Sequence, residues 1–466
     1  MNSLDAISPV DGRYRRTAEP LAAFFSERSL MRYRIVVEGE YLIYLSEYPH
    51  IGVRPFSDEE KGLVRKLADI TLEDASIIKA IETKGYEGIS RTNHDVKAVE
   101  YYMKLKLKGT TLDDVLEWIH FALTSEDCNN LAYAQMMSDA IGKVILPTLD
   151  KVDNAIGSLA HKYEQVPMLA RTHGQPASPT TIGKEFKVYH SRLERQLMQL
   201  ADYEILVKLN GATGNWSAHS IAYPNLSFMQ WYDFSKDFIK KFDEGRRLKL
   251  KHNRVTTQIE PHDTYAELFG IMSRINTILI DFNQDIWRYI SDEWVVQKPQ
   301  EDETGSSTMP HKVNPIDFEN SEGNLGMANA LFEFFSKKLP VSRLQRDLSD
   351  SSVLRNIGVS FAHSLIAYQS LLNGLERINV NEAKVVQELE EHPEVISEAY
   401  QTILRREGAD MPYERLKYLT RGKKVTMQDL WQFVESLDVS EAVKAELKRL
   451  TPTNYTGIAA LIVGSN

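Results

Sequence analysis

The chain has 466 residues, of which 42% are hydrophobic and 26% charged, and its formal net charge is −10. This composition is typical of a folded globular protein and excludes a disordered, collagen-like or low-complexity chain. The single cysteine, Cys128, excludes an intrachain disulfide and a cysteine-based zinc site. The acidic balance argues against broad nucleic-acid binding, because that function needs a basic face.

The sequence shows no signal for membrane insertion or export. Its first residues lack a basic region followed by an apolar run. The longest apolar stretches, such as residues 458–463, fall far short of the roughly 20 residues that span a bilayer. We therefore expect a cytoplasmic protein that does not cross a membrane.

Three domains are expected in chain order. Residues 1–118 mix short helices with loops and form an N-terminal domain. Residues 119–378 are expected to form a central bundle of long helices that carries the most unusual loop of the chain. Residues 379–466 are richer in charge and predict a small helical C-terminal domain.

The helices of the central bundle are predicted from hydrophobic spacing. Apolar residues recur at steps of three and four through 145–159, 186–200 and 354–375, and residues 325–339 are broadly apolar. This spacing keeps one apolar stripe of each helix facing a neighbour, as in bundles of nearly parallel helices. No segment alternates like a strand with hairpin turns around it, and no βαβ pattern occurs. The fold class is therefore mainly α.

One loop concentrates chemically useful residues. Residues 305–315 read Gly-Ser-Ser-Thr-Met-Pro-His-Lys-Val-Asn-Pro. The backbone N–H groups of its Gly-Ser-Ser start, with Lys312, suit a carboxylate or phosphate. Asn314 as a cap and Pro315 in the first turn predict the start of a helix. The alternative is a polar connection between two bundle helices.

Other polar segments add candidate acid–base groups. His173 lies between a threonine and a glycine, as in a turn, where a histidine can act as general acid or base. The alternative is a histidine that satisfies a local turn. Residues 91–95 and 123–127 are also polar, although each alone is typical of helix capping. No metal site is expected, because none of the twelve histidines has another three or four residues later.

Taken together, these segments resemble a known family. Residues 305–315 resemble the signature loop of the fumarase/aspartase superfamily. Further segments resemble the bacterial adenylosuccinate lyases, namely residues 8–14, 91–97, 124–127, 171–177, 257–263 and 342–347. The resemblance covers nearly the whole chain and is weakest beyond about residue 379. The chain departs from the family just before the loop, where Glu301, Asp302 and Glu303 form an acidic run.

The resemblance implies a function and an assembly. Members of the family eliminate fumarate from adenylosuccinate, which gives AMP, and from succinyl-aminoimidazole carboxamide ribotide, which gives AICAR, without a cofactor. They are homotetramers in which four bundles form a core of twenty helices, and three chains contribute to each site. By the same resemblance, Ser306 takes the place of the general base, His173 that of the general acid, and Glu319 that of the carboxylate that orients the histidine.

The resemblance also implies a set of substrate-binding residues. These residues are Arg13, Tyr14, Asn93, His94, Asp95, Thr124, Ser125, Gln258, Ser307, Lys312, Val313, Asn314, Arg346, Ser351 and Arg355. One alternative is another lyase of the superfamily, such as argininosuccinate lyase, aspartase or fumarase. A second alternative is a helical scaffold without catalytic activity, against which the intact His173, Ser306 and Lys312 argue.

Overall fold

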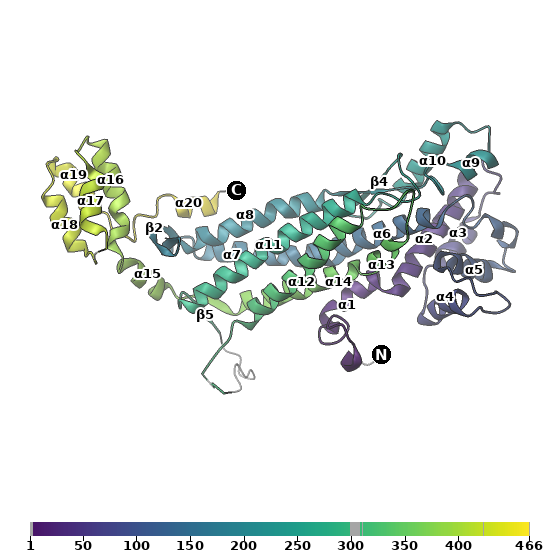
Figure 1. Ribbon diagram of the computed structural model, residues 1–466, viewed down its shortest axis with the longest axis horizontal. Coiled ribbons are helices and arrows are strands. Elements are labelled where there is room, and N and C mark those ends of the chain that lie inside the picture. Colours follow the sequence, from purple (N-terminus) through teal and green to yellow (C-terminus); the bar gives the residue numbers. More distant parts are fainter. Residues whose placement is uncertain (1–2, 299–307, 310, 423, 466) are drawn as a thin grey trace. The chain divides into compact units, whose positions relative to one another are not determined.

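A computed structural model describes residues 3–298, 308–309, 311–422 and 424–465 of the chain (Figure 1). By packing, the chain divides into two compact units. Unit 1 consists of Met1–Leu149, Gln196–Thr277 and Gly323–Gln369, and unit 2 of Asp150–Arg195, Ile278–Glu322 and Ser370–Asn466. The three sequence domains expected above stay a prediction. Ser306, Ser307 and the acidic run 301–303 lie outside the described residues.

Every boundary between the units falls inside a long helix. The long helices are α7 (Leu146–Lys162), α8 (Ile182–Ala201), α11 (Asp263–Ser291), α12 (Ile316–Lys338) and α14 (Ile357–Glu376). The spacing of apolar residues predicted most of these helices, and the predicted stripes are buried, for example Leu149, Val152 and Ile156 on α7. The α12 helix begins at Ile316, one residue later than the predicted start at Pro315.

The remaining elements of unit 1 are mostly helices. They are η1 (Ser3–Asp5), α1 (Arg15–Phe25), α2 (Glu27–Glu47), α3 (Asp58–Lys66), α4 (Leu72–Thr83), α5 (Asp95–Leu107), η2 (Asp113–Trp118), α6 (Ser125–Ala140), η3 (Ile141–Ile145), β3 (Glu204–Val207), α9 (Ser217–Ala222), α10 (Phe228–Lys240), β4 (Lys249–His252) and α13 (Ser349–Leu354). The β3 and β4 strands pair in parallel. Short polar side chains start several helices, as where the Ser26 hydroxyl accepts from the Ser29 N–H at the start of α2.

Unit 2 holds two short antiparallel sheets and a cluster of short helices. Its elements are β1 (Pro167–Thr172), β2 (Gln175–Thr181), β5 (Val295–Gln297), β6 (Ile378–Val380), α15 (Glu382–Glu390), η4 (Pro393–Ile396), α16 (Ser397–Arg406), α17 (Pro412–Thr420), α18 (Met427–Glu435), α19 (Glu441–Lys448) and α20 (Ala459–Gly464). Helices η4 and α15–α19 enclose an apolar core that includes Tyr400, Leu430 and Leu447.

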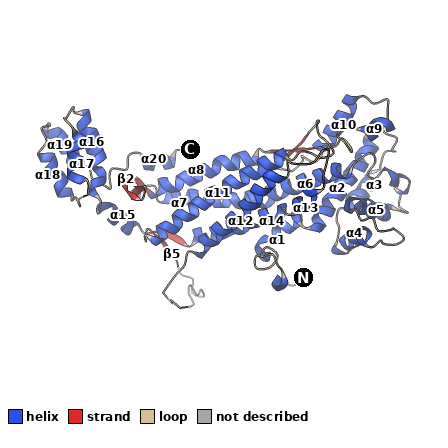
Figure 2. Cartoon of the chain, in the orientation of Figure 1, coloured by secondary structure: helices blue, strands red, loops and turns tan. Residues whose placement is uncertain are grey.

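Helices dominate the described residues, so the fold class is mainly α, as predicted (Figure 2). The sequence placed His173 in a turn but did not predict the short strands on either side of it. Strands β1 and β2 pair in antiparallel fashion around His173 and Gly174, whose φ angles are +53° and +73°. Two successive positive φ angles are the geometry of a tight hairpin turn. Neither strand has the alternating apolar and polar residues that would predict it. Among the described residues, no helix combines the length and hydrophobicity needed to span a lipid bilayer.

Close packing between α7 and α8 gives a stability prediction. A Cβ atom at Gly183 would lie 2.6 Å from the Glu164 backbone nitrogen, so Gly183→Ala should force the two helix ends apart. We expect a cost of about 1–3 kcal/mol, the usual range for overpacking, and a lower melting temperature in a thermal scan. Gly62→Ala on α3 is the matched control, because its Cβ meets nothing within 4 Å, and it should leave the melting temperature unchanged or raise it. Equal melting temperatures for Gly183→Ala and the wild type would contradict the packing described.

Candidate active site

A cavity of about 790 Å³ opens in unit 1. Nine of the predicted substrate-binding residues line it, namely Asn93, His94, Asp95, Thr124, Ser125, Gln258, Arg346, Ser351 and Arg355. The other lining residues are Glu82, Asn129, Leu344, Gln345, Asp347 and Leu348. Four stretches that lie far apart in the sequence therefore meet at one cavity within a single chain.

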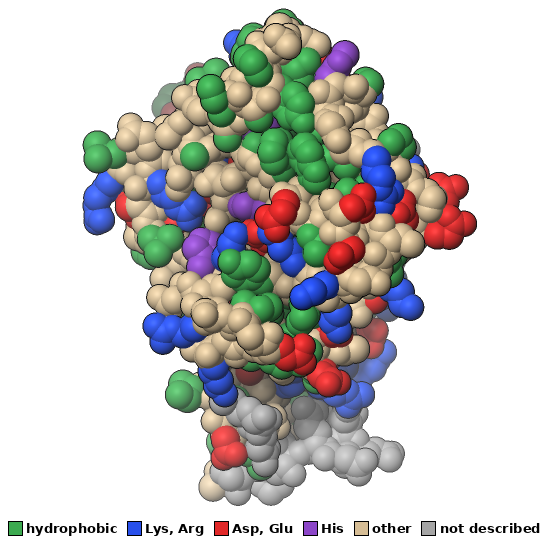
Figure 3. Space-filling view, turned by 90° about the vertical axis from the view of Figure 1, so that its right-hand side faces the viewer, with side chains coloured by type: hydrophobic (Ala, Val, Ile, Leu, Met, Phe, Trp, Pro, Cys, Tyr) green, Lys and Arg blue, Asp and Glu red, His purple; other side chains and the backbone are tan. Residues whose placement is uncertain are grey.

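Two helices begin at the cavity. His94 is the N-cap residue of α5, and Thr124 is the N-cap residue of α6. The N-terminus of a helix carries unpaired N–H groups and a partial positive charge, which favour an anionic ligand. On the face drawn in Figure 3, acidic and basic side chains are interspersed. The groups of the cavity that can attract an anion are therefore local, namely its own helix ends and its two lining arginines.

The His94 side chain links the two helix ends. Its Nδ1 accepts a hydrogen bond from the Lys97 backbone N–H at 3.3 Å. Its Nε2 lies 3.3 Å from the Ser125 hydroxyl oxygen. A neutral imidazole has one donor and one acceptor nitrogen, so Nε2 carries the proton and donates to Ser125. The hydroxyl hydrogen of Ser125 is then free to donate to a ligand.

Asp95 is held between two arginines. Its Oδ2 accepts from Arg34 and from Arg355, each at 2.7 Å. Burial alone would raise the pKa of Asp95, but the two guanidinium groups hold the pKa well below its usual range. Arg34 is buried and also donates to Asn129 at 2.9 Å. Because two cations share one carboxylate, the group of Arg34, Asp95 and Arg355 carries a net positive charge.

Arg346 contacts a buried cluster of ionisable residues, Glu126, His262 and Asp350, that does not line the cavity. Its Nη1 donates to Glu126 Oε2 at 3.0 Å. Burial raises the pKa of Glu126 to about 7, with Asp350 adding to the rise and Arg346 opposing it. Burial lowers the pKa of His262 to about 4 and raises the pKa of Asp350. When Glu126 carries a proton, the charge of Arg346 is free to meet an anion.

Among the described residues, the same cluster has the arrangement of ligand atoms that most resembles a metal site. One ligand-type atom each of Glu126, His262 and Asp350 lies within 4.8 Å of the others. Arg346 already occupies one oxygen of Glu126, and its positive charge disfavours a cation at this point. The residues therefore fit a charge-balancing cluster better than a metal centre.

The remaining predicted residues do not line the cavity. Arg13 and Tyr14 precede α1 in unit 1, with the Arg13 guanidinium 5.9 Å from the Tyr14 ring centre. Lys312, Val313 and Asn314 lie just before α12 in unit 2, where the Val313 carbonyl accepts from Gln297 at 3.2 Å.

The predicted contact between His173 and the orienting carboxylate of Glu319 is not present among the described residues. His173 stands in the turn between β1 and β2, where it is exposed and has no hydrogen-bond partner among the described residues. Glu319, on the first turn of α12, accepts from Trp287 Nε1 at 3.1 Å. The pairing of His173 with Glu319 stays a prediction.

The hairpin that carries His173 is anchored at its base. Arg171 on β1 forms an ion pair with Glu388 on α15. Trp294 donates to the other oxygen of Glu388 at 2.7 Å. These contacts fix the backbone that presents His173. Glu388 was not among the predicted residues.

Several other contributors were missed because they do not face the cavity. These residues are Arg34, Glu126, His262 and Asp350, which lie behind the lining side chains. Glu126 and His262 lie in segments 124–127 and 257–263, which resemble the family, although the resemblance gave these two residues no role. For Arg34, the signal in the sequence is a charged residue between the apolar Tyr33 and Ile35. That signal shows burial but not the partner.

Comparison with known proteins agrees with this geometry. The profile of a family described as "Lyase" matches residues 12–329, and that described as "Adenylosuccinate lyase C-terminal" matches residues 342–456. Two solved structures share the fold. They are a fumarate lyase from Mesorhizobium sp. BNC1 (TM-score 0.67, 16% identity, 96% of each chain) and the 3-carboxy-cis,cis-muconate lactonizing enzyme from Pseudomonas putida (TM-score 0.68, 18% identity, 96% of this chain and 95% of the other). The chain is thus an enzyme of the lyase class.

Full-length relatives narrow the assignment. The adenylosuccinate lyases of Haemophilus influenzae and Escherichia coli K12 are each 48% identical, over 99% of this chain and 99% of theirs. That of Dictyostelium discoideum is 48% identical over 98% of this chain and 97% of its own. The chain belongs to the adenylosuccinate lyase family.

The raised pKa of Glu126 predicts a pH-dependent stability. The folded state holds the Glu126 proton up to about pH 7, whereas an unfolded glutamate loses it near pH 4.3. Stability from this group is therefore full below about pH 4.3, falls as the pH rises toward 7, and stays low above that pH. Glutamine mimics the protonated form, so the melting temperature of Glu126→Gln relative to wild type should rise by a few degrees between pH 5 and pH 8.

Glu60→Gln is the control for that measurement. Arg54 and the Ser57 N–H lower the pKa of Glu60 to about 2, so it stays ionised in the folded protein over the whole range. Its melting-temperature difference from wild type should be nearly constant. A flat difference for Glu126→Gln as well would show that Glu126 does not titrate in this range.

Proposed function

We propose that the chain cleaves adenylosuccinate to AMP and fumarate, and succinyl-aminoimidazole carboxamide ribotide to AICAR and fumarate. Both reactions are β-eliminations across a C–N bond and need no cofactor. The full-length relatives are named adenylosuccinate lyases, and this name supports the substrate class.

One observation carries the proposal. A single cavity gathers nine side chains chosen from the family resemblance, with two helix N-termini and two arginines among them. Adenylosuccinate carries a phosphate and two carboxylates. A planar guanidinium binds either group through two hydrogen bonds, and helix N-termini bind anions through backbone N–H groups.

The groups proposed to carry out the elimination are not among those that line the cavity. Ser306 as alkoxide removes the proton from the carbon beside a substrate carboxylate. The electron pair forms the new C=C bond, and the C–N bond breaks. His173, as imidazolium, protonates the departing nitrogen, and Glu319 orients the imidazole and favours its charged form. Lys312, Asn314 and Ser307 hold the succinyl part, and Val313 of the same loop also contacts the substrate. Arg13 and Tyr14 contact the nucleotide.

The proposed assembly is a cytoplasmic homotetramer of three-domain chains in which three chains build each site. The exposed His173, without a partner in its own described chain, supports a site completed by another copy. The assembly and the location stay predictions, as do the two roles assigned to Ser306 and Ser307.

Product analysis tests the reaction. Purified protein with adenylosuccinate should give equal amounts of AMP and fumarate, whereas argininosuccinate and aspartate should give no fumarate. His173→Ala should lower kcat by about 10²–10⁴-fold, the usual contribution of a general acid, at an unchanged melting temperature. Fumarate from argininosuccinate or aspartate alone would move the assignment to another lyase of the superfamily. A folded protein inactive on all three substrates would favour the scaffold.

Subunit mixing tests the shared site. His173→Ala and Arg346→Ala homotetramers should each be nearly inactive. After subunit exchange, hybrids should regain part of the wild-type activity, because some sites then draw an intact His173 and an intact Arg346 from different chains. Light scattering gives the molar mass before and after mixing. A fully active monomer, or verified exchange without any regain, would contradict the shared site.

A further inference from the structure

A buried ion pair lies beneath the cavity. Lys208 directly follows β3, Asp127 lies in the first turn of α6, and both side chains are 0% exposed. The Lys208 Nζ stands 2.8 Å from Asp127 Oδ1. Neither residue is among those that line the cavity. Removing two charges from water costs several kcal/mol for each ion, and a well-packed apolar pair often serves stability equally well. The pair therefore calls for an explanation beyond stability.

The Lys208 ammonium has all of its donors in use. Besides Asp127, it donates to the Gly211 carbonyl and to the Gln258 carbonyl, each at 2.9 Å. An ammonium has three N–H donors and no acceptor, so its capacity is filled. Two of these three bonds go to backbone oxygens of different segments, and one of those segments carries a residue that lines the cavity.

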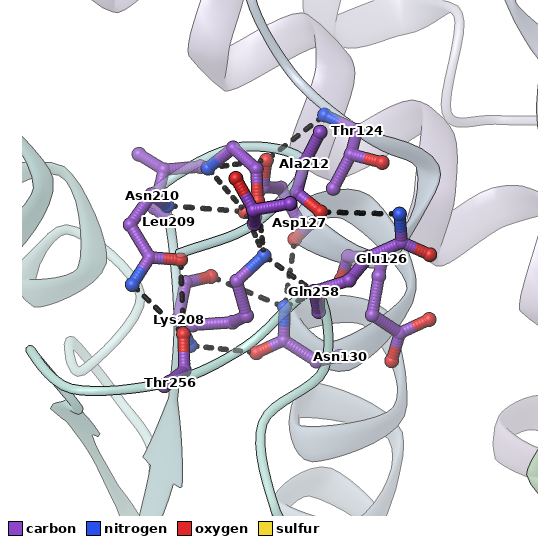
Figure 4. A network of polar contacts seen from close by, with 12 residues as sticks. Thr124, Glu126, Asp127, Asn130, Lys208, Leu209, Asn210, Ala212, Thr256 and Gln258 are labelled. Atoms are coloured by element: carbon purple, nitrogen blue, oxygen red, sulfur yellow. Dashed lines mark hydrogen bonds and ion pairs between the residues drawn. The ribbon is translucent and has the colours of Figure 1, made fainter. Parts of the chain in front are cut away.

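Asp127 connects a second part of the cavity wall, the start of α6, to Lys208. It accepts from the backbone N–H groups of Thr124 at 2.9 Å, Asn210 at 3.1 Å and Gly211 at 3.1 Å. Asn130 completes the network, because its Oδ1 accepts from the Lys208 N–H at 2.8 Å and its Nδ2 donates to the Lys208 carbonyl at 3.1 Å. Figure 4 shows the Lys208 and Asp127 side chains pointing toward one another at the centre of this network.

The network holds Gln258 at both ends. Its backbone carbonyl accepts from Lys208, and its side-chain Nε2 donates to the Ala212 carbonyl at 3.1 Å. Ala212 follows Gly211, whose own carbonyl and N–H are bound by Lys208 and Asp127. The network therefore fixes the position of the Gln258 side-chain amide at the cavity wall relative to Thr124 at the start of α6.

We propose that Lys208 and Asp127 are positioning residues for substrate binding. They do not touch the substrate. They set the place of Gln258 and of the first turn of α6, so that these groups meet the substrate without rearrangement. This inference rests on the proposed function, because substrate binding is the property that it explains.

The proposal predicts that substitutions in this ion pair change KM but not kcat. Groups that bind the ground state and the transition state equally affect KM and leave kcat unchanged, and a misplacement of about 1 Å can cost about 10²-fold. Lys208→Met should therefore raise the KM for adenylosuccinate by about 10–100-fold, with kcat within about threefold of wild type. A purely structural role would lower the melting temperature or the amount of folded enzyme but would leave KM unchanged.

Arg246→Met is the matched control. Arg246 pairs with Asp139, also on α6, at 3.3 Å, and both side chains are largely buried. Neither residue lines the cavity. The control variant thus loses a buried ion pair from the same helix and unit, and its KM should equal that of wild type. A similar KM increase in both variants would overturn the positioning role in favour of a general loss of stability.

Two further variants keep the test decisive. If Lys208→Met does not fold, Lys208→Met with Asp127→Asn removes the uncompensated charge and should still show the raised KM, because the bonds to Gly211 and Gln258 remain lost. In a Gln258→Ala background, Lys208→Met should add much less than it does alone, since coupled residues are not additive. A wild-type KM in the folded double variant, or full additivity with Gln258→Ala, would overturn the proposal.

The result also separates this inference from the proposed function. Wild-type protein that forms no AMP and fumarate from adenylosuccinate would refute the function, and the inference with it. Wild-type protein that is active, with a folded Lys208→Met variant of unchanged KM, would refute the inference alone.

Discussion

The charges buried around the cavity must be neutralised inside the protein, and this requirement shapes the site. Arg34 pairs with Asp95 and Lys208 with Asp127, and Arg346 pairs with Glu126 when that glutamate is ionised. In each pair the partners come from segments far apart in the sequence. A buried charge that loses its partner costs several kcal/mol, so none of these segments can shift alone. The cavity wall is therefore set by electrostatic pairing as well as by apolar packing.

The same pairing prepares the cavity for an anion. The protein as a whole is acidic, with a net charge of −10, so a substrate with several negative charges has to find a local positive field. Two arginines around one aspartate, and an arginine backed by a glutamate of raised pKa, supply that field together with the ends of α5 and α6. Because these dipoles and charges are already oriented, binding needs little reorganisation.

The residues that line the cavity were easier to identify from the sequence than the residues behind them that hold them in place. The resemblance to a known family, and not the polar pattern alone, identified the nine residues that line the cavity. Arg34 and Lys208 were missed, because each acts through an ion pair with a residue 61 or 81 positions away along the chain. The hairpin at His173 was missed for another reason. Its turn depends on two positive φ angles and not on an alternating pattern.

The groups expected to transfer protons and the groups that form the cavity belong to different units of the chain. A tight turn and the Arg171–Glu388 ion pair hold the backbone that presents His173. Its imidazole has no partner in the described chain, so its hydrogen bonds remain available for a leaving group or another copy. The charged network in unit 1 does not include His173. Binding and proton transfer therefore depend on separate sets of contacts, and substitutions in the two sets should affect different kinetic constants.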